Sequence, residues 1–226
     1  MPDWLQLMMA SFWPLILGGI KFTIPLALLS FAAGLVLAFF AALIHLFGPA
    51  PLVAIVRFYI WLIRGTPLLV QLFVIFYGLP SAGLVLDPLS AALIGFSLNV
   101  GAYNAEVIRG AIESIPRGQW DAAYSLNMTR GQALRRTILP QAARVAVPPL
   151  ANSFISLVKD TSLAAVITVP EVFQAAQRIA AVTYEPLVLY CEAALIYLAI
   201  CSVLSAAQTR LERHYGRHAV FSERQR

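Results

Sequence analysis

Seven polar side chains interrupt apolar stretches of the chain and are the strongest candidates for contacting a ligand. They are Gln71, Asn99, Tyr103, Lys159, Asp160, Thr161 and Ser162. A charged group at the centre of a bilayer costs roughly 2.5–3.5 kcal/mol on insertion scales, so it faces protein or water and often marks function. The set combines an ammonium, a carboxylate, amides and hydroxyls, which are the partners that a buried zwitterion needs. These residues predict a polar pathway for a zwitterionic solute.

Two parts of this set have alternatives that the sequence leaves open. Lys159 and Asp160 are adjacent within one apolar segment, and they either line the pathway or form an ion pair that holds the helices together. Thr161 and Ser162 can bond to backbone or to ligand. Gln71 lies shortly after the break that Pro67 makes, and broken helices in transporters often line binding cavities.

The remaining candidates occur as pairs at helical spacing. Asn99 and Tyr103 are four residues apart and share one helix face, and Asn152 and Ser156 repeat this arrangement in a later segment. Polar residues at this spacing either bond between packed helices or contact the substrate. Glu192, inside the last apolar segment, has the same two alternatives of helix contact and pathway lining.

Membrane-spanning helices must position these side chains. The 226 residues are 60% hydrophobic and only 12% charged, whereas soluble domains are about 25% charged. Because about 20 apolar residues span a bilayer, we expect an all-α integral membrane protein with a single domain, residues 1–226. Five spans are expected, at about 15–46, 65–86, 88–112, 145–169 and 186–208. Residues 51–63 carry a helical apolar stripe and predict either a separate helix, at the membrane interface or against the bundle, or a continuation of the second span.

Arginine and lysine residues predict the orientation of the spans, because short loops rich in them stay cytoplasmic. Most of the basic residues flank the first loop, the loop at 113–144 and the C-terminal tail, which includes Arg217, Arg224 and Arg226. The N-terminus is therefore expected outside and the C-terminus in the cytoplasm. Since topology accounts for the net charge of +5, we expect membrane lipid and no nucleic acid as a partner.

The loop at 113–144 is too long and too polar for a simple connector. It predicts two short helices, at 119–126 and 129–138, followed by Leu139-Pro140 before the next span. Asn127 lies between the helices, where a chain reversal favours a residue that tolerates positive φ. The loop is either a docking element that projects into the cytoplasm or a solvated connection.

The residues Asp121-Ala122-Ala123, Asn127 and Leu139-Pro140 resemble the "EAA" loop in permease subunits of ATP-binding-cassette importers. The spacing fits that pattern, with Asp121 in place of Glu, Asn127 in place of Gly and Thr137 in place of Ile. Asp keeps the charge and Asn keeps access to positive φ, whereas Thr137 weakens the match. The resemblance implies that an ATPase couples to Gly118, Asp121, Ala122, Ala123, Asn127, Leu139 and Pro140.

Further segments resemble the branch of these permeases that serves polar amino acids (histidine, glutamate, glutamine, arginine and opines). They include Arg64-Gly65-Thr66-Pro67, Glu106, Arg109-Gly110 and the run from Leu157 to Leu163, and the nearest likeness is to cystine permeases. The resemblance implies a bacterial cytoplasmic (inner) membrane location and import of a polar amino acid. It also implies as partners two copies of an ATP-binding subunit, an external (periplasmic or extracellular) amino-acid-binding protein and a second permease copy or paralogue.

The sequence contains no motif that predicts catalysis, nucleotide binding or metal binding by this chain itself. The sequence has no phosphate-binding Gly-rich loop, no metal-ligand cluster around His45, His214 or His218, and no Ser/His/Asp set at plausible depth. We therefore expect no cofactor and no enzymatic activity, with ATP hydrolysis on a separate chain. The alternatives are a self-contained secondary amino-acid transporter or channel, which five spans make awkward, and an intramembrane enzyme.

Overall fold

The computed structural model describes residues 3–216, with side chains as far as Arg210, and the described part is helical with no strand. This confirms the predicted fold class. Within the described residues, four helices are long and apolar enough to cross a membrane, or five if one bent pair forms a span. Some residues that entered the predictions lie outside the described part, namely Arg217, His218, Arg224 and Arg226.

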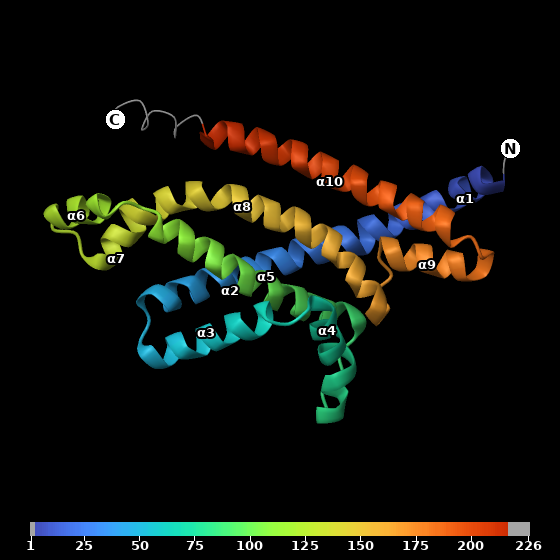
Figure 1. Ribbon diagram of the computed structural model, residues 1–226, viewed down its shortest axis with the longest axis horizontal. Helices are drawn as coiled ribbons and strands as arrows, with labels where there is room; N and C mark the ends of the chain where they lie inside the picture. Colours follow the sequence, from blue (N-terminus) through green and yellow to red (C-terminus); the bar gives the residue numbers. More distant parts are fainter. Residues whose placement is uncertain (1–2, 217–226) are drawn as a thin grey trace.

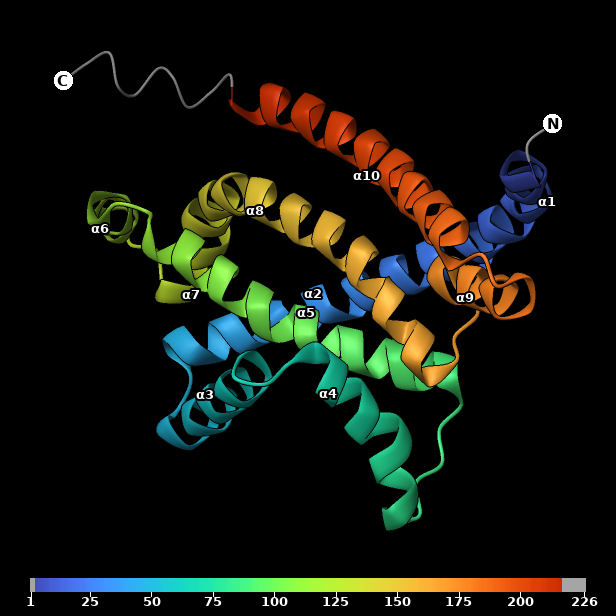
Figure 2. The same ribbon diagram turned by 45° about the vertical axis from the view of Figure 1, so that its right-hand side comes forward.

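Four long helices form the body of the protein: α2 (Ile24–Phe47), α5 (Pro88–Glu113), α8 (Leu139–Asp160) and α10 (Pro186–Gly216). The shorter helices are α1 (Asp3–Gly18), α3 (Ala50–Arg64), α4 (Leu68–Phe73), α6 (Arg117–Ser125), α7 (Arg130–Ala133) and α9 (Val172–Thr183). α6 and α7 lie at one end of the long axis, whereas the start of α1 and all of α9 lie towards the other end (Figures 1 and 2). The first helix begins well before the expected residue 15, and α9 is an element that the sequence analysis did not predict.

Three π turns occur within the helices of the described residues, and each is followed after one further residue by a proline. The turns are η1 (Gly19–Thr23), η2 (Val74–Gly78) and η4 (Leu134–Ile138), and the prolines are Pro25, Pro80 and Pro140. Proline lacks an N–H and its ring clashes with the carbonyl four residues earlier, so a wider turn with bonds five residues back accommodates it. At Pro25 and Pro140 the helix continues past the wider turn, whereas Pro80 lies in the 3₁₀ turn Leu79–Ala82 that ends its segment.

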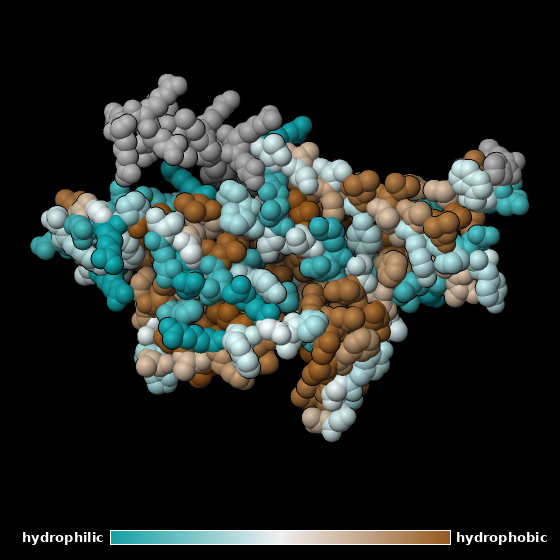
Figure 3. Space-filling model, viewed as in Figure 1, coloured by the Kyte–Doolittle hydropathy of each residue, from teal (hydrophilic) through white to brown (hydrophobic). Residues whose placement is uncertain are grey.

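The chain bends sharply after α3. α3 and the segment Leu68–Ala82, which comprises α4, η2 and the 3₁₀ turn η3 (Leu79–Ala82), meet at 105°. Pro67 disfavours helical backbone at the residue before it, and Gly83 ends the segment with φ 84°. The helical part is therefore shorter than the expected 65–86, and residues 51–63 lie in α3, which the bend divides from it. The segment projects from the body as a hydrophobic arm (Figures 2 and 3).

The two short helices expected at 119–126 and 129–138 are present, as α6 and as α7 with η4, but the second runs on into the next span. Residues 130–167 form one continuous helical stretch, through α7, η4, α8 and the 3₁₀ turn η5 (Thr161–Ile167). Its start is fixed by a capping box, in which the Thr129 N–H donates to Gln132 Oε1 at 2.9 Å and the Gln132 N–H donates to Thr129 Oγ1 at 3.4 Å. The π turn η4 absorbs Pro140, which is why this proline does not interrupt the helix.

The core of the body is the close pair of α2 and α5. A Cβ placed on Gly34 would lie 2.5 Å from Cγ1 of Val100, so the two backbones approach more closely than any side chain at this position would allow. α3 is fastened to the same pair, because the Tyr59 hydroxyl donates to the Leu98 carbonyl at 2.6 Å. The tight packing fixes α5, on whose far side the polar residues lie.

Candidate functional site

A cavity of about 770 Å³ opens between the end of α3, the start of α4, α5 and α8. This volume lies within the range of roughly 300–1,000 Å³ that is usual for small-molecule sites. Its lining combines seven apolar residues with ten polar or charged ones: Arg64, Thr66, Asn99, Tyr103, Asn104, Glu106, Asn152, Ser153, Ser156 and Asp160. The fold therefore forms an open, partly polar cavity within a strongly hydrophobic protein.

Helical spacing explains why so many polar groups meet in the cavity. On α8, Asn152, Ser156 and Asp160 follow one another at intervals of four and line the same wall. On α5, Asn99 and Tyr103 do the same. Both faces contribute to the lining of this one cavity.

The cavity contains charges of both signs. Arg64 Nη1 lies 3.9 Å from Glu106 Oε2, and the Arg64 guanidinium lies 5.4 Å from the ring centroid of Tyr103. Asp160 supplies a second carboxylate on the opposite wall. Asn104 is 1% exposed, and its Nδ2 has no hydrogen-bond partner in the described structure, so a donor remains available in the lining.

Of the seven candidate pathway residues, Asn99, Tyr103 and Asp160 line the cavity and Gln71 does not. The Gln71 amide donates to the Ile63 carbonyl at 2.7 Å, and to the carbonyl and hydroxyl of Thr66 at 3.0 and 2.9 Å. It therefore satisfies the backbone that the bend at Pro67 leaves unpaired.

The four residues from Lys159 to Ser162 lie in three different environments. Lys159 and Ser162 line a second, mainly apolar crevice of about 450 Å³ beside α10, whereas Asp160 faces the polar cavity. Thr161 is buried and donates to the Val158 carbonyl at 2.7 Å. No Lys159–Asp160 contact is among the ion pairs within 4.0 Å that the described residues form.

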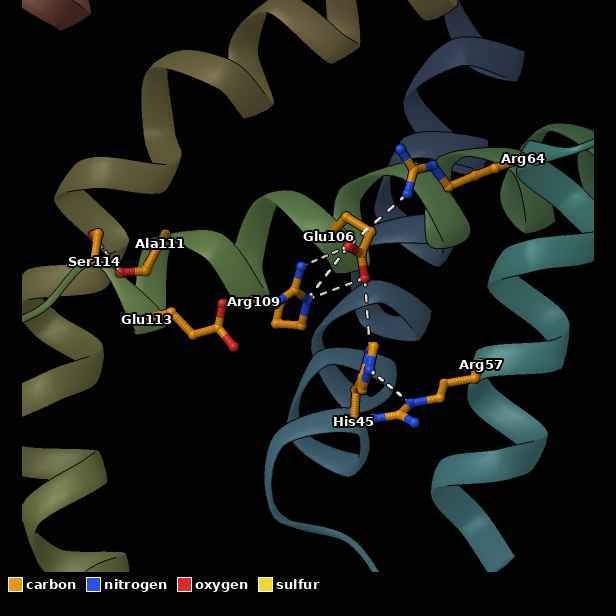
Figure 4. A network of polar contacts seen from close by, with 8 residues as sticks. All are labelled: His45, Arg57, Arg64, Glu106, Arg109, Ala111, Glu113 and Ser114. Atoms are coloured by element: carbon orange, nitrogen blue, oxygen red, sulfur yellow. Dashed lines mark hydrogen bonds and ion pairs between the residues drawn. The ribbon is translucent and has the colours of Figure 1, made fainter. Parts of the chain in front are cut away.

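A polar network lies beside the cavity, at the C-terminal end of α2 (Figure 4). Its centre is Glu106, whose carboxylate accepts from Arg109 at 2.8 Å. Arg109 also donates to Glu113 at 2.6 Å. Glu106 further faces Arg64 and His45, which come from α3 and α2. The sequence alone does not show these contacts of His45, because they depend on tertiary packing.

Two other buried acids have structural partners. Glu192 is 2% exposed and accepts from the Ser11 hydroxyl at 2.5 Å, which joins α10 to α1. Glu171 is fully buried, accepts from the Gln174 N–H at 2.6 Å as the N-cap of α9, and also accepts from the Tyr197 hydroxyl. Burial raises the pKa of Glu171. The described residues contain no group of three or more potential metal ligands.

The 113–144 region presents an exposed helix on an apolar base. Trp120 and Ala123 of α6 face inward, with the Trp120 ring 6.4 Å from that of Phe47, whereas Asp121 and Ala122 are exposed. The Gln141 amide donates to Gln119 Oε1 at 3.0 Å and ties α6 to α8. Of the other candidate coupling residues, Gly118 and Pro140 are exposed and Leu139 is partly buried.

The turn between α6 and α7 has the conformation expected for Asn127. Its φ of 59° confirms the prediction of positive φ at this position. The Asn127 N–H donates to the Tyr124 carbonyl at 2.9 Å, and the Met128 N–H donates to the Ala123 carbonyl at 3.2 Å. These two bonds form a Schellman motif with Asn127 as its left-handed residue.

A polar cavity among apolar helices, together with an exposed helical loop at one end, defines the membrane subunit of a transport system. The comparison with protein families agrees, because residues 34–217 match the family described as "Binding-protein-dependent transport system inner membrane component". The chain belongs to this family. It is the membrane permease of an ABC importer, and ATP hydrolysis takes place on a separate subunit.

Its relatives are permeases for amino acids. The chain is 52% identical over 214 residues to the L-cystine transport system permease protein TcyB of Bacillus subtilis, covering 94% of this chain and 92% of that protein. It is 38% identical over 216 residues to the glutamine transport system permease protein GlnP of Escherichia coli, covering 93% and 96%. These relatives favour the importer over a self-contained secondary transporter or channel.

Solved structures give the same fold. An amino acid ABC transporter with histidines is 34% identical, with a TM-score of 0.88 over 95% of this chain and 99% of that chain. The inward-facing MetNI methionine ABC transporter has a TM-score of 0.69 at 17% identity, over 95% and 99% of the two chains, and this likeness concerns the fold alone.

Proposed function

We propose that this permease carries a polar amino acid through the cavity between α4, α5 and α8. The observation that carries the proposal is the lining, which brings a guanidinium, two carboxylates and an unpartnered amide donor into one cavity. A zwitterion in a low-dielectric site needs a partner for each charge, since an unpaired buried charge costs several kcal/mol. Arg64 can pair with a carboxylate, and Glu106 or Asp160 with an ammonium group.

Cystine is the proposed substrate. The support is the 52% identity to a cystine permease over almost the whole chain, compared with 38% to a glutamine permease. Cystine carries two carboxylates and two ammonium groups, and the cavity offers charged groups on opposite walls, on α5 and α8. A smaller amino acid with one of each group would leave one wall without a charged partner.

The proposed partners follow from the surfaces of the protein. A binding protein outside the cell delivers the substrate, and a second permease, either a copy or a paralogue, covers the open side of the cavity, because lipid cannot satisfy its polar groups. Two ATP-binding subunits dock, one on the α6 helix of each permease, with Asp121 and Ala122 at the contact. In this arrangement the N-terminus lies outside and the C-terminus in the cytoplasm.

The test is uptake by liposomes that contain the permease, its ATPase and its binding protein. We expect ATP-driven uptake of radiolabelled cystine in preference to glutamine, and a loss of uptake in Asp160→Asn with assembly unchanged. Asp87→Asn is the matched control, since Asp87 caps α5 away from the cavity and asparagine caps equally well. Uptake by the permease alone without ATP, or wild-type uptake in Asp160→Asn, would contradict the proposal.

A further inference from the structure

His45 lies between two charged groups near the inner end of α2 (Figure 4). Arg57 Nε of α3 donates to His45 Nε2 at 3.2 Å. On the other side of the ring, His45 Nδ1 lies 3.6 Å from Oε1 of Glu106. This nitrogen is buried and has no hydrogen-bond partner within the described structure. The ring therefore bridges α3 to the carboxylate that lines the cavity.

The donor on Arg57 determines which nitrogen of His45 carries the proton. An arginine guanidinium only donates, so Nε2 must be an acceptor without a hydrogen. A neutral imidazole then has its proton on Nδ1, the nitrogen that faces Glu106. A small shortening of the 3.6 Å separation gives a hydrogen bond from His45 to Glu106.

The other groups around Glu106 leave this contact as the adjustable one. Arg109, on the same helix, already donates to both oxygens of Glu106 at 2.8–3.3 Å, and it is held in turn by Glu113. Arg64 is 3.9 Å away and also lines the cavity. Histidine is the side chain of this group that as a residue type titrates near neutral pH, whereas arginine remains charged.

We propose that His45, oriented by Arg57, is a positioning residue that sets how strongly Glu106 can hold a substrate in the cavity. The inference rests on the proposed function in one respect, namely that the ligand of Glu106 is the ammonium group of an amino acid. With neutral His45, the Nδ1–H contact is weak, and the ligand shares Glu106 only with the arginines. Arg57 keeps the ring in this tautomer.

The consequence is a dependence of binding on pH. A second proton on His45 converts Nε2 into a donor that faces the donor of Arg57, and it places two positive charges side by side. The imidazolium turns from Arg57 towards Glu106, and it then competes with the ammonium of the ligand. The charged groups that face His45 and Glu106 are Arg57 and Arg64 from α3, and Arg109 from α5. These arginines keep their charge throughout the range in which histidine titrates, about pH 5–8.

The experiment measures binding of radiolabelled cystine to the purified permease–ATPase complex, without the binding protein, at about pH 5.5 and about pH 7.5, on either side of histidine titration. We expect the wild-type Kd to rise about tenfold at the lower pH, the factor that one charge-assisted hydrogen bond carries. His45→Gln keeps a neutral donor and acceptor but cannot be protonated, so its Kd should stay near the higher-pH wild-type value at both pH values.

A nitrogen-15 NMR spectrum of the histidine-labelled complex gives a second readout that does not depend on transport. We expect the Nδ1–H tautomer for His45 in the wild type and its loss in Arg57→Leu, with Arg57→Lys as the conservative variant that restores a donor. An Nε2–H tautomer in the wild type, or the same pH dependence in the wild type and His45→Gln, would overturn the inference. If the wild type shows the Nδ1–H tautomer but does not bind cystine, the proposed substrate is wrong. The assignment of the His45 proton by Arg57 would still be supported.

Discussion

Asn127 allows a quantitative test of the turn that separates α6 from α7. Its backbone has φ 59° in a Schellman motif whose two hydrogen bonds run to Ala123 and Tyr124. Left-handed backbone costs an ordinary L-residue roughly 1–2 kcal/mol, from which glycine and, in part, asparagine are exempt. Asn127→Val should therefore destabilise the turn by about this amount, a factor of about 5–30 in its population, whereas Asn127→Gly should leave it intact.

The effect should be visible in activity because α6 is short. It has nine residues and is largely exposed, so little else in the loop compensates for a weakened turn. The assay is ATP-driven uptake in liposomes, together with retention of the ATPase on the tagged permease during purification. We expect both to fall in Asn127→Val and to remain at the wild-type level in Asn127→Gly.

A matched control introduces the same side chain one residue further on. Met128 has no positive φ, so Met128→Val places a β-branched residue where its backbone is tolerated. Equal uptake by Asn127→Val and Asn127→Gly would refute the argument from backbone conformation. Equal losses in Asn127→Val and Met128→Val would show that the β-branched side chain, and not φ, is responsible.

Three further predictions concern the framework around the cavity. Gly34→Leu should lower the thermal unfolding midpoint of the purified permease, because even a Cβ at this position would lie 2.5 Å from Val100. Overpacking α2 against α5 in this way costs about 1–3 kcal/mol. An unchanged midpoint would contradict the close approach of the two helices. Gln71→Leu should cost about 1–3 kcal/mol by leaving the carbonyls of Ile63 and Thr66 unpaired, and Gln71→Glu, which removes the same donor, should behave alike in the same melting assay. Hydrogen bonds from Ser90 lower the pKa of Asp87. The stabilisation of α5 by Asp87 is therefore present above the ordinary carboxyl pKa and is lost as the pH falls through the lowered value. The difference in melting temperature between wild type and Asp87→Ala should close at acid pH, and a difference independent of pH would refute this.

Features of the site that depend on local chemistry could be predicted from the sequence. Asn127 is such a case, because a helix end that reverses the chain requires positive φ whatever lies around it. The pairs at intervals of four are another, since helix geometry alone places Asn152 and Ser156 on one face. Extending that interval once more reaches Asp160, which lines the same wall.

Features that depend on packing between distant segments were not accessible. Lys159 and Asp160 are adjacent in the sequence, yet successive residues on a helix point in different directions, so one faces the apolar crevice and the other the cavity. Gln71 is polar and close to a helix break, and only the structure shows that its partners are the carbonyls of the break itself. His45 and Glu106 come together only because α2 packs closely on α5.

The π turn η4 (Leu134–Ile138) also has a geometric consequence for the whole molecule. A π turn contains one residue more than the α-helical turn it replaces, and each residue of an α-helix advances the direction of its side chain by about 100°. The loop at α6 and the cavity wall on α8 therefore keep the relative direction of a regular helix, although one extra residue lies between them beside Pro140. Deleting one residue from 134–138 would convert the π turn into an α turn and leave the wall facing α5, but it would bring the ring of Pro140 against the carbonyl four residues before it.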